Sequence, residues 1–137
     1  MADDNPPAPG VTRERVLEVA NEAMRGTLME RMGIEWLEVG TARLVARMPV
    51  EGNEQVYGLL HGGATAALCE TVGSFGTAVV VGLDRRVAGI QITVNHLRAA
   101  RRATSRASAS HSGSDGTSPC GTSGSRATTT AWWPRPR

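Results

Sequence analysis

The segment Gln55–Ser74, QVYGLLHGGATAALCETVGS, holds most of the residues whose types and spacing could perform chemistry. His61, Gly62 and Gly63 lie where a polar, glycine-rich loop meets a long apolar run. The first backbone N–H groups of a helix have no intrahelical partner and lie at its positive dipole end, so such a junction can bind an oxyanion. Glycine lets a substrate carbonyl approach the main chain closely. The pattern predicts an oxyanion site at the start of a helix.

Glu70 is the one charged residue in the predicted helix 64–83, and Ser74 follows it by four residues on the same helix face. A carboxylate in apolar surroundings is paired, protonated or functional. As a functional group it would be a general base, or a nucleophile that attacks a carbonyl directly. The local pattern leaves an alternative open, in which Glu70 reaches solvent past small neighbours or contacts a partner chain.

The other reactive residue types are ambiguous when each is taken singly. His61 and His96 are then more typical of structural histidines, and Gln55 of a polar loop residue. Cys69 adjoins Glu70 but does not share its helix face, which favours a small buried residue over a nucleophile. Cys69 and Cys120 lie far apart without metal-ligand spacing, so we expect neither a disulfide framework nor a metal site, and a reducing cytoplasm is the default.

The elements that must position these residues follow from periodicity. The sequence predicts a flexible lead over residues 1–10, and then a helix capped by Thr12 whose apolar stripe continues to Leu28. It predicts a hairpin of strands 34–39 and 41–50, and a further strand over 86–98 that lies on the central helix. In the hairpin we expect Leu44, Ala46 and Met48 to face the core. In the last strand we expect five residues to face one way, namely Ala88, Ile90, Ile92, Val94 and His96.

Composition limits the class of protein. A chain of 137 residues fits one domain, and with 4% aromatic residues its core must be mainly aliphatic. We expect neither a membrane span nor a secretory signal, because no window approaches eighteen uninterrupted apolar residues and the first ten residues are acidic and proline-rich. Residues 102–137 contain no Ile, Leu, Val, Met or Phe, which predicts a low-complexity, disordered tail.

Two stretches, GLLHGGATAALCETVGS and GIQITVNHLRAAR, resemble the hotdog-fold acyl-CoA thioesterases. The resemblance is to the branch of 4-hydroxybenzoyl-CoA, 1,4-dihydroxy-2-naphthoyl-CoA and phenylacetate-pathway thioesterases, and it covers residues 11–101. It rests on HGG, on the carboxylate nine residues after the histidine, and on the NH pair that ends the next strand. It implies an α+β hotdog fold, in which an antiparallel sheet wraps a long helix, and a homodimer or tetramer with the active site across an interface.

The resemblance also implies roles for single residues. Glu70 would be the nucleophile or the base for water, and Ser74 would position the water or the carboxylate. The backbone N–H of Gly62 would polarise the thioester carbonyl from the facing subunit. Gln55 and His61 would orient or polarise the same carbonyl.

Three further positions would bind substrate, namely Gly63, Asn95 and His96. A thioester is a reactive acyl donor, so a base and an oxyanion site are sufficient without a metal or redox cofactor. The implied partners are an acyl-CoA or aryl-CoA and a second copy of the chain, with no nucleic acid and no membrane.

The resemblance stops where the family continues with three more strands. In place of those strands lies the Ser/Thr/Gly/Arg tail, so we expect the C-terminal strands to be missing and the activity of the chain as written to be impaired. A frameshift explains this, because G+C-rich codons for the tail can encode strand-like segments in another frame. Sequencing the gene across the codons for residues 99–103 tests this hypothesis.

Other functions remain open. A non-catalytic hotdog module that binds acyl-CoA as a regulatory ligand would keep the groove but would not need Glu70. The tail has five dispersed Arg residues and the pair Trp132 and Trp133, which gives a nucleic-acid arm weak support. Hotdog hydratases use an Asp/His pair that the sequence lacks.

Overall fold

The computed structural model describes residues 12–41, 43–82, 85–100, 104–110, 117–122 and 125–132, and after residue 100 it describes the backbone alone. These ranges contain three helices and six strands. The helices are α1 (Arg13–Glu22), α2 (Leu28–Arg31) and α3 (Gly62–Val81). The strands are β1 (Glu35–Val39), β2 (Arg43–Pro49), β3 (Ala88–His96), β4 (Thr104–Ser110), β5 (Thr117–Thr122) and β6 (Ser125–Trp132).

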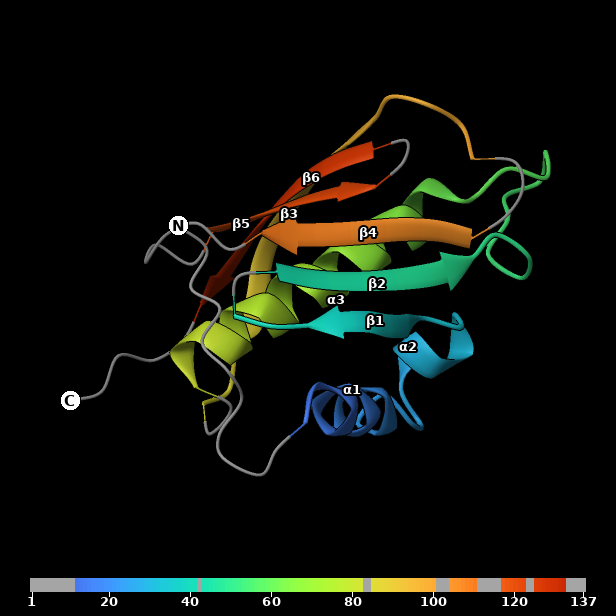
Figure 1. Ribbon diagram of the computed structural model, residues 1–137. Helices are drawn as coiled ribbons and strands as arrows, with labels where there is room; N and C mark the ends of the chain where they lie inside the picture. Colours follow the sequence, from blue (N-terminus) through green and yellow to red (C-terminus); the bar gives the residue numbers. More distant parts are fainter. Residues whose placement is uncertain are drawn as a thin grey trace.

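The strands form one antiparallel sheet in the order β1-β2-β4-β5-β6-β3. Figure 1 shows α3 along one face of this sheet, with α1 and α2 beside the β1 edge. The long helix contacts every strand from β2 to β6. This arrangement confirms the predicted α+β class with a central helix against an antiparallel sheet.

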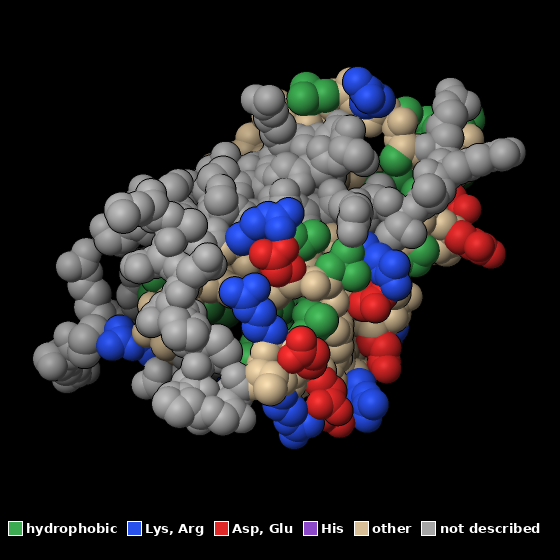
Figure 2. All heavy atoms as spheres, in the orientation of Figure 1, with side chains coloured by type: hydrophobic (Ala, Val, Ile, Leu, Met, Phe, Trp, Pro, Cys, Tyr) green, Lys and Arg blue, Asp and Glu red, His purple; other side chains and the backbone are tan. Residues whose placement is uncertain are grey.

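The hairpin of β1 and β2 confirms the predicted buried face of β2, although Val45 of the other face is buried as well. Leu44, Ala46 and Met48 are each at most 1% exposed and face α3. On the outer face, Arg47 pairs with Glu35 at 2.6 Å, and a second Arg–Glu pair lies near the turn. Figure 2 shows basic and acidic side chains interspersed over the described part of this side of the molecule. One strand therefore supplies both the core and a solvated surface.

The α3 helix is buried along one face and half-buried along the other. The buried face includes Leu68, Cys69 and Val72, each 0% exposed. At Gly76, an added Cβ would lie 3.3 Å from Cδ1 of Leu44, so helix and sheet approach closely there. By length and composition alone α3 could cross a membrane. Its packing against five strands accounts for the same apolar composition.

The N-terminal helix is shorter than its apolar stripe predicts. Thr12 caps α1 as expected and accepts a hydrogen bond from Arg15 N at 3.2 Å. The helix ends at Glu22, because the chain turns at Gly26 with φ +73° and starts α2 after Thr27. Leu28, the last residue of the predicted stripe, is 58% exposed, so the prediction is wrong for this turn.

The predicted facing of β3 is correct only in part. Ile92 and Val94 pack against the core, but Ile90 is 66% exposed. The pairing of β3 with β6 shifts register between Gly89 and Gln91, which leaves Ile90 in a bulge. A bulge inserts an extra residue and changes the direction of the neighbouring side chains, so strict alternation fails at this point.

The prediction that the C-terminal strands are missing is wrong for the described backbone. Residues 104–110, 117–122 and 125–132 form β4, β5 and β6 in the middle of the sheet. Strand pairing is made by backbone groups, which every residue except proline supplies in full, so a stretch of small polar residues can complete the ladder. Apolar content decides how much such strands stabilise the fold, and not whether their backbones pair.

Candidate active site

The loop before α3 ends in a histidine cap. His61 has an extended backbone, with φ −65° and ψ 134°, and its Nδ1 accepts a hydrogen bond from Gly63 N at 2.8 Å. A neutral imidazole that accepts at Nδ1 carries its proton on Nε2. Within the described part of the chain, no partner accepts from the N–H of Gly62. Gly62 therefore offers a free donor at the helix N-terminus, whereas the Gly63 N–H is already used.

Asn53 fastens this loop to the sheet. Its side-chain amide donates to Met32 O at 2.9 Å and to Pro49 O at 3.0 Å. Its backbone carbonyl accepts from His61 N at 2.9 Å. Sequence reasoning missed Asn53, although an asparagine after a strand and Gly52 is a turn signal. Gln55 lies in the same loop, where its side chain accepts from Tyr57 N at 2.6 Å. Its amide oxygen is therefore engaged locally in this structure.

His96 comes to the start of α3 from the end of β3. An ideal Cβ on Gly62 would lie 2.9 Å from His96 Nε2, so the imidazole lies directly over the glycine. Asn95 precedes it on β3 and is exposed. The structure thus brings His61, Gly62, Gly63 and His96 together at one end of α3.

Glu70 and Ser74 form the second group. Ser74 Oγ donates to Glu70 Oε1 at 2.8 Å, and both side chains are half-buried, which confirms the shared helix face. Within the described residues, no hydrogen bond is made to Oε2. Cys69 lies on the buried face, as expected for a core residue. Glu70 therefore keeps one oxygen available for chemistry.

Gly89 of β3 lies directly against this carboxylate. An ideal Cβ on Gly89 would fall 1.7 Å from Glu70 Oε1, and its three nearest atoms all belong to the Glu70 carboxyl group. Sequence reasoning missed Gly89, because it read the residue only as a member of an alternating strand. An isolated glycine within a strand is nevertheless a signal of close approach or of a bulge.

Glu70 and Ser74 line a groove of about 540 Å³ between α1, α2 and α3. Most of its walls are apolar. They include Met24 and Met29, as well as Trp36 and Phe75, whose rings lie 4.8 Å apart between centroids. Among the described lining residues, Glu70 and Arg85 are charged. It can therefore take an apolar group and place it beside the carboxylate.

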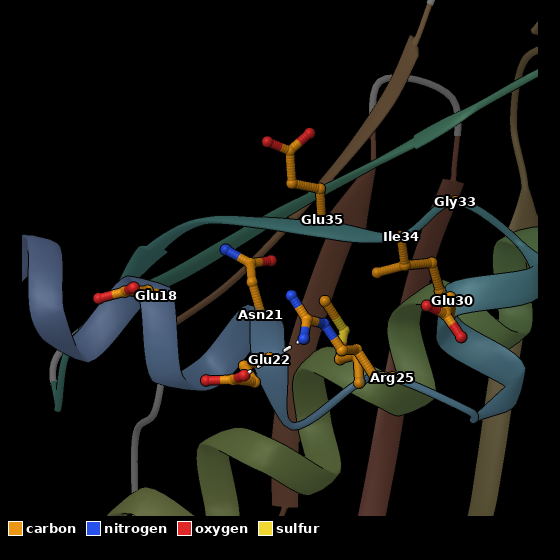
Figure 3. Close-up of a pocket in the computed structure, with 9 residues that line it drawn as sticks. Glu18, Asn21, Glu22, Arg25, Glu30, Gly33, Ile34 and Glu35 are labelled. Carbon is orange, nitrogen blue, oxygen red and sulfur yellow. Dashed lines mark hydrogen bonds and ion pairs between the residues drawn. The ribbon is translucent and has the colours of Figure 1, made fainter.

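A second hollow, of about 510 Å³, lies between α1 and β1 and has a different character. Figure 3 shows Glu18, Glu22, Glu30 and Glu35 around it, with Arg25 beside Glu22. Asn21 at its centre exchanges two hydrogen bonds with the Trp36 backbone, at 3.2 and 2.8 Å, and so joins α1 to the sheet edge. Glu18, Glu22 and Glu35 are each paired with an arginine. With Glu30 the lining still carries more carboxylates than cations, so this hollow is less suitable for an anionic ligand than the apolar groove.

The two groups of site residues do not meet within one chain. Gly62 and Glu70 are eight residues apart on α3, which corresponds to about 12 Å along the helix axis. A substrate carbonyl in contact with Glu70 is therefore beyond hydrogen-bond reach of the Gly62 N–H of the same chain.

The chain has relatives among known thioesterases. A family model described as the thioesterase superfamily matches residues 57–115. The chain is 43% identical over 88 residues to the proofreading thioesterase EntH of Cronobacter turicensis, which is 64% of each protein. It is 36% identical over 90 residues to the 1,4-dihydroxy-2-naphthoyl-CoA hydrolase of Escherichia coli, covering 65% of this chain and 66% of that enzyme. The ComA2 protein of Bacillus subtilis is 40% identical over 86 residues, 61% of this chain and 68% of the relative.

The chain thus spans slightly less than two thirds of the length of EntH. The structural likeness extends over more of the chain. A variant of a thioesterase from Pseudomonas aeruginosa superimposes with a TM-score of 0.78 at 28% identity, over 84% of this chain and 91% of that one. A thioesterase from Haemophilus influenzae gives 0.75 at 29% identity, over 85% and 90%. From its sequence and its fold, the chain belongs to the hotdog thioesterase superfamily.

Proposed function

We propose that the protein hydrolyses acyl-CoA or aryl-CoA thioesters to a free acid and CoA. The observation that carries this proposal is the environment of the Glu70 carboxylate and its hydrogen bonding. Among the described residues that line the apolar groove, it is the one carboxylate. One of its oxygens accepts from Ser74, and the other has no hydrogen-bond partner in the same part of the chain. A carboxylate held in this way is suited to attack an ester carbon or to take a proton from water.

Two routes lead to the same products. As a base, Glu70 takes a proton from water, the hydroxide adds to the carbonyl carbon, and the C–S bond breaks so that CoA leaves as a thiolate and is then protonated. As a nucleophile, Glu70 displaces the thiolate to form a mixed anhydride, which water hydrolyses. In both routes negative charge develops on the carbonyl oxygen, where a backbone N–H stabilises it.

A second copy of the chain would supply that N–H. The Gly62 N–H of the same chain lies about 12 Å from Glu70 along α3, so one chain does not complete the site. In the other copy, Gly62 would face this carboxylate. β3 is an edge strand of the sheet, and most of its residues are exposed, which offers a surface for pairing with a second copy.

The groove favours an apolar acyl group. Its aromatic and methionine walls would hold an aryl or alkyl chain beside Glu70, with the CoA portion outside the groove. The Escherichia coli relative is named as the hydrolase of an aryl-CoA, which supports a preference for aryl thioesters. We expect the reaction to occur in the cytoplasm.

The test is a comparison of substrates and variants. The purified full chain is incubated with benzoyl-CoA and with acetyl-CoA, and the free thiol is measured. We expect faster release from benzoyl-CoA, and its loss in Glu70→Gln. Tight binding of benzoyl-CoA without hydrolysis, unchanged in Glu70→Gln, would instead indicate an acyl-CoA-binding regulatory module.

A further inference from the structure

The bulge of β3 lies beside the carboxylate that carries the proposed reaction. An ideal Cβ on Gly89 would lie 1.7 Å from Glu70 Oε1 and 3.1 Å from Oε2. The backbone of Gly89 is not in the left-handed region, since no positive φ occurs at this residue. Backbone conformation therefore does not require a glycine here, and the space taken by Glu70 does.

We propose that Gly89 is a positioning residue for Glu70, and this inference rests on the proposed function of that glutamate. The main chain of Gly89 on one side and the Ser74 hydroxyl on the other hold Oε1 in place. Oε2 is then the oxygen turned toward the substrate, as base or nucleophile. The bulge between Gly89 and Gln91 brings the strand backbone into this position.

The size of the effect follows from the distances. An ordinary contact with a Cβ begins at 3.4 Å, so a methyl group on Gly89 would force the carboxylate oxygen to retreat by about 1.7 Å, the difference between the two distances. A misplacement of about 1 Å can cost 10²-fold in rate. We therefore expect Gly89→Ala to lower kcat by about 10- to 100-fold, with KM changed by less than about three-fold.

Gly40→Ala is the matched control. Gly40 also lacks a positive φ, and among the described residues its Cβ would meet a backbone carbonyl alone, Arg43 O, at 3.3 Å. It lies at the opposite edge of the sheet, between β1 and β2. We expect Gly40→Ala to leave kcat within about two-fold, because residues without shared partners act independently.

A double-mutant cycle separates positioning from a general structural role. Glu70→Asp withdraws the carboxylate by about one bond, roughly 1.5 Å, which removes the clash with an alanine at position 89. We expect the two changes to be non-additive, so that Gly89→Ala costs at least about five-fold less in kcat in the Glu70→Asp background than alone. Losses that simply multiply would overturn the proposal.

Crystal structures of the full chain and of Gly89→Ala provide a readout that does not depend on activity. We expect the Glu70 carboxylate to leave its position and the bond from Ser74 to be lost. An unmoved carboxylate, with β3 displaced instead, would overturn the positioning role. If the parent chain hydrolyses no thioester, the proposed function fails, while the structural comparison still decides whether Gly89 positions Glu70.

Discussion

The two candidate regions on α3 differ in the kind of group that they present: one presents a main-chain group and the other a side chain. At Gly62 the proposed functional group is a main-chain N–H, which has no acceptor among the described residues because it lies in the first turn of α3. At Glu70 it is a side-chain carboxylate, oriented by Ser74 and bounded by Gly89. In the proposed reaction, the Gly62 N–H donates a hydrogen bond to the substrate, and the Glu70 carboxylate accepts a proton or attacks the thioester. A side-chain substitution therefore tests Glu70 directly, whereas Gly62 must be tested by a change to its backbone.

The largest effect is expected from Glu70→Gln. The amide keeps the shape of the side chain and can still accept from Ser74, but it is a poor base and a poor nucleophile. We expect kcat for benzoyl-CoA to fall by about 10²-fold or more, with little change in the melting temperature. Equal rates for the variant and the parent would remove Glu70 from the chemistry.

Gly62→Pro tests the other region through its backbone. Proline is tolerated at the first position of a helix, and the ψ of 134° at His61 is the conformation that a residue before proline adopts. The change deletes the N–H, so we expect a loss of about 10²-fold in kcat.

Gly62→Ala is the control, because its Cβ makes the same approach to the His96 ring while the N–H stays. The His96 ring is the end of a side chain and can move. We expect the alanine variant to keep at least about ten times the activity of the proline variant. Equal losses would mean that the side chain at position 62 matters and its N–H does not.

Ser74→Ala is expected to have an intermediate effect. It removes one hydrogen bond to the Glu70 carboxylate but leaves Gly89 in place. A hydrogen bond to a charged group contributes about 1.5 kcal/mol, so we expect a loss of about ten-fold in kcat. Ser74→Thr keeps the hydroxyl and should retain most of the activity, and steady-state rates for both variants test this.

His61→Asn should have the smallest effect. Asparagine is a good helix cap, and its side-chain oxygen can replace Nδ1 as the acceptor from Gly63 N. If capping is the main role of His61, kcat stays within about three-fold and the melting temperature is preserved. A loss of more than about ten-fold would restore the predicted role of His61 in polarising the carbonyl.

The sequence predicted those parts of the fold that depend on local periodicity. The alternation of Leu44, Ala46 and Met48 defined the buried face of β2, and the apolar run around Glu70 defined α3. The hydrogen bond from Ser74 to Glu70 follows directly from their spacing by four residues. These features can be predicted from residues that are near in sequence and from the period of the helix or strand.

The features that the sequence missed depend on contacts between distant segments. Gly89 lies against Glu70 only because β3 has a bulge at this point, and Asn53 matters because it joins Met32 and Pro49. The early end of α1 depends on the turn at Gly26. Periodicity carries no information on any of these contacts.

The C-terminal strands differ from the rest of the sheet in composition. β4, β5 and β6 pair through their backbones, yet residues 102–137 supply no Ile, Leu, Val, Met or Phe to a core. The frameshift hypothesis predicts that a frame-restored chain has a higher melting temperature, because aliphatic residues on these strands would bury more apolar surface against α3. Calorimetry of both chains tests this, and sequencing the gene over residues 99–103 tests the frame itself.

Mixing two variants of low activity tests the proposed shared site most directly. Glu70→Gln and Gly62→Pro chains are unfolded together, refolded at equal concentration and assayed with benzoyl-CoA. Each hybrid dimer then has one site that joins an intact Glu70 to an intact Gly62, so we expect about one quarter of the parent activity. Activity no higher than the mean of the two separate variants would contradict a site completed by a second copy.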